Sequence, residues 1–158
     1  MLRRSAVQLA AVVTAVVGLS LVAAVPASAT EEERGRWVPY PTTSPIAGPS
    51  TWHCSRNIPV ETQVLVQVCA IRSADQQSAQ GAVIVRNNRS GLYGAAVALM
   101  LEGDEGPIDI RWTCPQSGVA AGTWSVCFGA WVNSPYPSWV RTVNPGVNGQ
   151  PLANSGSV

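Results

Sequence analysis

The residues of this chain that could perform chemistry are few, and they do not form a catalytic pattern. His53 is the single histidine, so a Ser-His-Asp site would have to use it. No Gly-x-Ser-x-Gly motif accompanies it. His53 stands directly beside Cys54, which we expect to be oxidised and therefore not a free nucleophile. We interpret His53 as a surface or strand-edge residue and predict that the protein is not an enzyme.

Four carboxylates surround one predicted turn and raise the question of a metal or acid–base site. They are Glu102, Asp104, Glu105 and Asp109. Their spacing does not match the EF-hand calcium loop. A glycosidase needs two carboxylates at a fixed separation across a cleft, and nothing in the sequence favours that arrangement. We interpret the four as solvated turn residues and expect no metal and no cofactor.

The four cysteines predict two disulfides. An even number of cysteines in an exported chain is typical of disulfide bonding, and three connectivities are possible. A structural zinc site would need closely spaced Cys-x-x-Cys pairs, and none is present. A Trp-x-Cys unit followed by a Val-Cys unit occurs twice, about 60 residues apart. This repeat favours two local bridges, each joining a Trp-x-Cys strand to the next cysteine along the chain: Cys54–Cys69 and Cys114–Cys127.

Each Trp-x-Cys unit also predicts where its tryptophan points. Trp52 lies two residues before Cys54, and Trp112 lies two residues before Cys114. Residues two apart on a strand share a face of the sheet. We therefore expect Trp52 and Trp112 to pack in the core against the disulfides.

The remaining aromatic residues are the feature that points most clearly to a binding role. Trp131, Tyr136 and Trp139 lie in a stretch interrupted by Pro135 and Pro137. Proline cannot donate to a strand ladder, so this stretch does not fit a central strand. Exposed Trp and Tyr rings offer flat faces to sugars, peptides or other ligands. The alternative is that the rings cover the end of the fold. We predict that these three form the contact surface if the protein binds a ligand.

The N-terminal residues predict export. Two arginines at positions 3 and 4 precede an uncharged run over residues 5–25, then Pro26 and the small residues Ala27-Ser28-Ala29. This order is typical of a signal peptide, residues 1–29, cleaved after Ala29. The alternative is a membrane anchor, because the apolar run is long enough to span a bilayer. The arginine pair leaves open whether export uses the general or the twin-arginine route.

Charge excludes two classes of partner for the mature chain. All ten basic residues are arginine, and removing Arg3 and Arg4 leaves eight against nine acidic residues. A chain of this charge has no basic field to attract nucleic acid or anionic lipid. We expect no nucleic-acid partner, no membrane contact after cleavage and a secreted, extracellular location.

The elements that must position these residues are predicted to be short strands. Residues 30–50 are acidic and then proline-rich, which indicates a flexible linker. Runs of β-branched residues and period-two alternation follow, with turns at 87–91, 103–107 and 115–122. We predict one all-β domain over 51–145, a sandwich of six or seven antiparallel strands with immunoglobulin-like architecture, and a flexible tail over 146–158. The predicted strands are 64–71, 81–86, 92–101 (a central strand), 108–114, 123–132 and 139–143.

Several short motifs add a resemblance. They are Trp52-x-Cys54, VQVC at 66–69, VRNNRS at 85–90 and AGTWSVC at 121–127. Together with the arginine-only signal segment, these motifs resemble the small secreted proteins of Streptomyces and related actinobacteria. The resemblance covers roughly residues 51–143. It implies export, two disulfides and a β-rich domain, and it implies no activity.

Two functional hypotheses follow. The first is a non-catalytic binding module whose partner is cell-wall glycan, extracellular polysaccharide or another secreted protein. The second is a small secreted protease inhibitor or other enzyme-directed protein, for which residues 115–121 beside Cys114 would be the candidate reactive loop.

Overall fold

The chain folds as an all-β sandwich of two packed sheets. The computed structural model describes residues 31–46, 50–104 and 106–158, which form no helix. The predicted signal peptide, residues 1–29, lies outside the described residues. In the part of the chain that the structure describes, no helical segment has the length and hydrophobicity of a membrane span.

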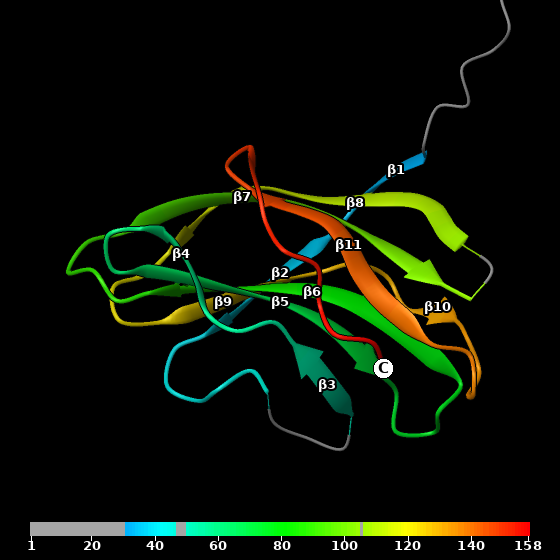
Figure 1. The fold of residues 1–158 in the computed structure, drawn as a ribbon. Helices are drawn as coiled ribbons and strands as arrows, with labels where there is room; N and C mark the ends of the chain where they lie inside the picture. The colour runs from blue at the N-terminus through cyan, green and yellow to red at the C-terminus, as the bar shows by residue number, and fades with distance from the viewer. Residues whose placement is uncertain (1–30, 47–49, 105) are drawn as a thin grey trace, which may run out of the picture.

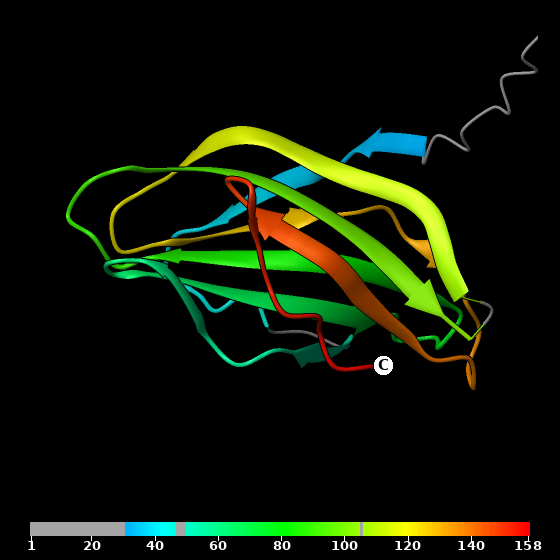
Figure 2. The ribbon, with the colours of Figure 1, turned by 45° about the horizontal axis from the view of Figure 1, so that its top comes forward.

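Figures 1 and 2 show the two layers, which we call sheet I and sheet II. Sheet I has the strand order β1-β8-β7-β11-β12, and sheet II has the order β2-β9-β6-β5-β3, with β4 on β5 and β10 on β6. The strands of sheet I are β1 (Glu31–Arg34), β7 (Tyr93–Gly103), β8 (Gly106–Val119), β11 (Val140–Val147) and β12 (Gln150–Pro151). Those of sheet II are β2 (Arg36–Tyr40), β3 (Thr51–Cys54), β4 (Ile58–Glu61), β5 (Val64–Arg72), β6 (Ser78–Asn87), β9 (Trp124–Phe128) and β10 (Val132–Asn133).

The core lies between the sheets, where alternate residues of each strand point inward. On β7, burial alternates along the strand, and β7 lies between β8 and β11, which confirms its prediction as a central strand. Trp112 on β8 is completely buried in this core, as predicted. The inward face of sheet II is lined by valines of β5 and β6. They are Val64, Val66, Val68, Val83 and Val85.

Sheet II is apolar on its outer face as well. Ile71, Ile84, Val126 and Phe128 are buried there in a second cluster, against which Trp52 and others pack. Trp52 is therefore half-buried beside the Cys54–Cys69 disulfide on the outside of sheet II, not in the core between the sheets. The expectation for Trp52 was correct about the disulfide neighbour and wrong about the location.

The disulfide connectivity is the predicted one, but the two bridges differ in what they join. Cys54 and Cys69 are opposite each other on β3 and β5, with Cα atoms 4.0 Å apart. Cys114 on β8 and Cys127 on β9 join sheet I to sheet II, with Cα atoms 6.0 Å apart. The repeated sequence unit therefore corresponds to a bridge within one sheet in the first case and to a bridge between the sheets in the second. The turn between β8 and β9 takes the chain from one sheet to the other.

Both predicted flexible segments contain strands. In the segment 30–50, predicted as a linker, β1 pairs in parallel with β8, and β2 pairs with β9. In the predicted tail 146–158, β12 pairs with β11, and Leu152 and Val158 pack against the core. Edge strands are stabilised by backbone hydrogen bonds, so they need not show the period-two pattern that the prediction required. These strands also raise the count above the predicted six or seven and add one parallel pair.

Gly35 is where the N-terminal chain passes from sheet I to sheet II. A Cβ atom at this position would lie 2.8 Å from Cys114 Sγ and 2.9 Å from the carbonyl oxygen of Phe128. Neither neighbour is the end of a flexible side chain. Glycine is therefore needed here so that the crossing strand can lie against the inter-sheet disulfide.

We expect Gly35→Ala to lower the free energy of unfolding by about 2 kcal/mol, because overpacking of this kind typically costs 1–3 kcal/mol. Urea denaturation of the oxidised protein measures the change. Gly91→Ala is the matched control, because nothing lies within 4 Å of a Cβ atom there. If Gly35→Ala lowers the free energy of unfolding no more than Gly91→Ala does, Gly35 is not closely packed against the inter-sheet disulfide.

Candidate ligand-binding surfaces

The three aromatic residues predicted to contact a ligand are all exposed. The exposed fractions are 48% for Trp131, 71% for Tyr136 and 39% for Trp139. They lie on the segment 131–139, which follows β9 and pairs briefly with β6 through β10. Their exposure agrees with a contact surface, and their role in binding stays a prediction.

Arg72, the last residue of β5, holds this segment from beneath. Its side chain is only 2% exposed. The guanidinium donates hydrogen bonds to the carbonyl oxygens of Ser134 and Ser138, and a further one, of 2.9 Å, to that of Val158. Burial lowers the pKa of Arg72, an effect that the nearby Asp104 opposes, and a guanidinium stays protonated at physiological pH. A buried positive charge therefore fixes the two ends of the turn that carries Tyr136.

Backbone hydrogen bonds complete the frame of the segment. The Ser134 amide donates to the carbonyl of Gln77 over 3.0 Å, and the Tyr136 amide donates to that of Gln76 over 2.9 Å. The amide of Trp139 donates to a carboxylate oxygen of the β7–β8 turn over 3.2 Å. The segment is thus tied to the β5–β6 turn and to the β7–β8 turn at once.

The three rings form separate contact points and not one stacked platform. In the described part of the chain, no two of them pack against each other. The guanidinium of Arg141 lies 5.7 Å from the ring centroid of Trp139. Strand β9 ends at Phe128, so the alternation of faces along the strand does not continue to Trp131. The rings of Phe128 and Trp131 line the same cleft.

This cleft, which we call the aromatic cleft, lies on the outer face of sheet II and has a volume of about 280 Å³. Trp52 and Phe128 meet edge to face within it, with centroids 6.0 Å apart. Gln80 is 7% exposed, and its Nε2 donates to the carbonyl of Gly129 over 2.8 Å. The cleft is lined by Arg36, Tyr40, Trp52, Gln80, Phe128 and Trp131, together with Pro45 and Ser50.

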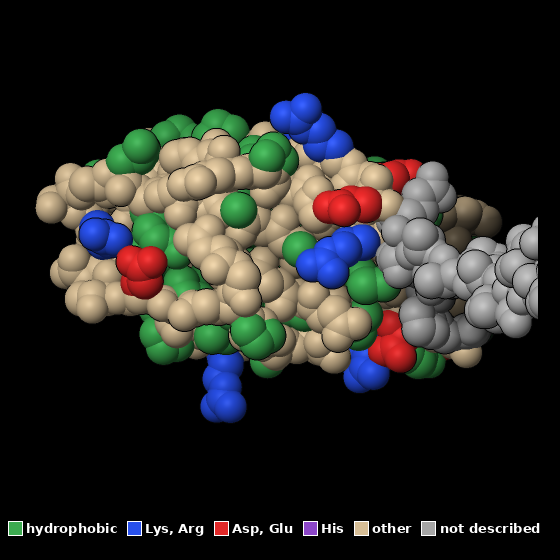
Figure 3. Space-filling model, turned by 90° about the horizontal axis from the view of Figure 1, so that it is seen from above, with side chains coloured by type: hydrophobic (Ala, Val, Ile, Leu, Met, Phe, Trp, Pro, Cys, Tyr) green, Lys and Arg blue, Asp and Glu red, His purple; other side chains and the backbone are tan. Residues whose placement is uncertain are grey.

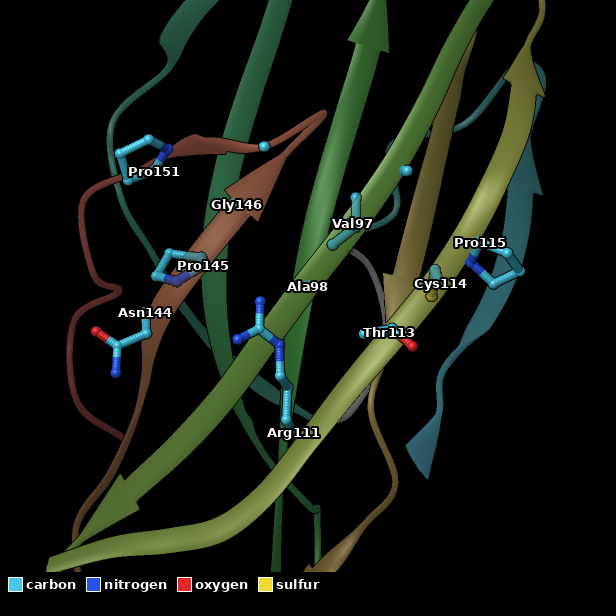
Figure 4. Close-up of a pocket in the computed structure, with 12 residues that line it drawn as sticks. Val97, Ala98, Arg111, Thr113, Cys114, Pro115, Asn144, Pro145, Gly146 and Pro151 are labelled. Atoms are coloured by element: carbon cyan, nitrogen blue, oxygen red, sulfur yellow. The ribbon is translucent and has the colours of Figure 1, made fainter. Parts of the chain in front are cut away.

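A larger groove of about 410 Å³ lies on the outer face of sheet I (Figure 4). Ala98 of β7 lies between Pro115 of β8 and Pro145 of β11, and Arg111 and Asn144 add polar groups. Figure 3 looks onto this face and shows only scattered charged side chains. Apart from Arg111 and Asn144, the residues that line the groove are mostly small or cyclic, and no sequence pattern predicted that they form a groove. They include no nucleophile with an adjacent base.

His53 and Glu102, which were also considered for chemistry, have structural partners. His53 lies exposed on the edge strand β3, where Nδ1 contacts the carbonyl of Ser157, which confirms its interpretation as a strand-edge residue. Glu102 forms an ion pair of 2.6 Å with Arg141. Glu105 and the side chain of Asp109 lie outside what the structure describes. Among the described residues, no group of three or more His, Cys, Asp or Glu could hold a metal ion.

The candidate reactive loop at 115–121 is not a loop. Strand β8 continues to Val119, and Tyr93 and Ala95 of β7 pair with Val119 and Ser117. Pro115 is accommodated because the pairing has a bulge between Ala95 and Val97. The expectation of a turn over 115–122 is therefore wrong for its first five residues.

No protein-family model matches this chain, and comparisons with curated proteins and with solved structures also found no match.

Proposed function

We propose that this protein is a secreted, non-catalytic binding module that contacts an extracellular glycan or protein through the segment 131–139. The observation that supports this most directly is the buried Arg72 beneath the segment. Its hydrogen bonds to Ser134 and Ser138 hold exposed aromatic residues in place without covering them.

A fixed aromatic segment suits binding for an energetic reason. Association must offset the cost of ordering side chains and loops, about 0.5–1.5 kcal/mol for each mobile side chain. Here the backbone is already held by Arg72 and by the amides of Ser134 and Tyr136. Tyr and Trp are also the residue types that most often dominate binding energy at interfaces.

The chemistry of the rest of the chain agrees with an extracellular partner that is recognised through local contacts and not through a long-range electrostatic field. Both disulfides require oxidising conditions, which export provides. The near balance of acidic and basic residues gives no long-range attraction to a polyanion. The inhibitor hypothesis loses its candidate loop, because residues 115–119 belong to β8.

We expect Tyr136→Ala and Trp139→Ala each to weaken binding by about tenfold, equivalent to about 1.4 kcal/mol. The melting temperature should stay nearly unchanged, because exposed side chains contribute little to the core. The measurement is binding of the purified secreted protein to isolated cell-wall polysaccharide and to culture-supernatant proteins.

Leu92→Ala is the matched control, because Leu92 and Tyr136 are both 71% exposed and Leu92 lies outside the segment. Unchanged binding by both aromatic variants would refute the assignment of the contact surface. If Trp139→Ala instead unfolds the domain, the Trp139 ring contributes to the core, and Trp139 is no longer assigned to the contact surface.

A further inference from the structure

We propose that the aromatic cleft is a subsite for one acidic sugar residue, a uronic acid, of a glycan ligand. This proposal deepens the proposed function and rests on it, because Trp131 belongs both to the cleft and to the segment 131–139. Three properties of the cleft lead to this ligand class. They are its size and aromatic lining, the side-chain amide of Gln80 and the exposed guanidinium of Arg36.

The size and lining suit a single sugar ring. The volume of about 280 Å³ equals roughly nine water molecules at about 30 Å³ each. Trp131 is half exposed at the cleft, while Trp52 and Phe128 hold each other edge to face. The C–H face of a pyranose can therefore pack on an exposed ring that stands beside a rigid aromatic pair.

The buried amide supplies a directed acceptor for a hydroxyl group. Gln80 is more than nine-tenths buried, and its Nε2 is fixed by the carbonyl of Gly129. Gln80 belongs to the wall of the cleft, and among the described residues no donor bonds to its Oε1. An amide oxygen held in place through its own Nε2 can accept a hydrogen bond from an O–H group of a ligand.

The charge selects an acidic sugar. Arg36 is exposed at the cleft and forms no ion pair with a described residue. The residues that line the cleft include no carboxylate, so its net charge is positive. A guanidinium binds a carboxylate through two parallel hydrogen bonds, which gives both affinity and orientation.

The test compares tetragalacturonate with its methyl ester, which keeps the same rings and linkages but removes the carboxylate charge. Titration calorimetry on the full secreted chain measures both affinities. We expect the acid to bind about tenfold more tightly than the ester. Arg36→Gln should lower the affinity for the acid to that for the ester and leave the ester unchanged, whereas Trp131→Ala should weaken both by about tenfold.

The control is Arg56→Gln, which removes another exposed arginine from outside the cleft and should change neither affinity. Equal binding of acid and ester, an Arg36→Gln variant that behaves as the unsubstituted protein, or no binding of either probe would each overturn the subsite. Loss of acid binding on filling the sheet I groove by Ala98→Leu would also overturn it, because the ligand would then lie on the opposite face.

Failure of the subsite and failure of the proposed function give different results. If wall polysaccharide or a secreted protein still binds through Tyr136 and Trp139 while neither probe binds, only the subsite is wrong. If the acid binds through Arg36 and Trp131 but substitution of Tyr136 and Trp139 changes no interaction, the residues from Tyr136 to Trp139 are not part of the contact surface, and the subsite in the cleft is supported.

Discussion

Replacing both Cys114 and Cys127 with alanine should lower the free energy of unfolding by about 4 kcal/mol, compared with about 3 kcal/mol for the Cys54→Ala/Cys69→Ala pair. The chain-entropy contribution is nearly equal for the two bridges, because their sequence separations are 13 and 15 residues. The difference comes from what surrounds each bridge.

The inter-sheet bridge is part of the core. Cys114 is 1% exposed and Cys127 is completely buried, and Gly35 lies directly against Cys114 Sγ. Removing the two sulfur atoms therefore leaves unfilled space between the sheets, and such space adds to the cost of losing the bridge. Cys54 is only half-buried, on the outer face of sheet II, so the surroundings there can adjust more easily.

Urea denaturation of the oxidised protein and of the two double variants measures both losses. Gly35→Ala in the Cys114→Ala/Cys127→Ala background provides an internal check, because the space left by the sulfur atoms should reduce the cost of the added methyl group. A loss at Cys114–Cys127 smaller than that at Cys54–Cys69 would show that the inter-sheet bridge contributes less than its burial indicates.

The disulfides also show how far the sequence predicts the fold. The repeated Trp-x-Cys units predicted both bridges correctly, because short loops favour local pairing. They could not show that β8 and β9 lie in different sheets. A turn of the same residue types can join neighbours in one sheet or carry the chain across to the other, and packing of the whole core decides between them.

Strands were predictable where their own side chains enter the core. β5, β7 and residues 110–114 of β8 show β-branched runs or alternation that matches their burial. β1, β2 and β12 were missed, because they are held at sheet edges largely by backbone bonds to β8, β9 and β11. The acidic and proline-rich composition of these segments reports on their side chains, so it could not predict the backbone hydrogen bonds that make them strands.

The candidate site divides in the same way. Pro135 and Pro137 indicated that Trp131, Tyr136 and Trp139 do not lie on a central strand, but they left open whether the rings are exposed or cover the end of the fold. The role of Arg72 was not predictable. An arginine at the end of an apolar run resembles a solvated strand end, and its carbonyl partners stand 62 to 86 residues further along the chain.

Substituting Arg72 tests how the fold and the proposed surface are connected. We expect Arg72→Met to lower the free energy of unfolding by about 3 kcal/mol, because it removes hydrogen bonds from a charged donor to three carbonyl groups. Arg72→Lys should lower the free energy of unfolding by about 2 kcal/mol, since an ammonium group keeps the charge but cannot reproduce the planar arrangement of guanidinium donors. Urea denaturation measures both changes.

Arg72 should also act on binding through the segment that it positions. Without the guanidinium, the backbone that carries Tyr136 and Trp139 has more conformational freedom. Ligand binding must then order this backbone and both side chains, which costs free energy. We expect Arg72→Lys to weaken binding by about tenfold at a temperature where the variant is fully folded. Gly35→Ala is the control matched in stability, because it should also lose about 2 kcal/mol but lies at the inter-sheet disulfide. Equal binding by Arg72→Lys and Gly35→Ala would mean that Arg72 stabilises the fold without positioning the aromatic residues. Weaker binding by Arg72→Lys alone would show that the buried arginine holds the contact surface in its binding geometry.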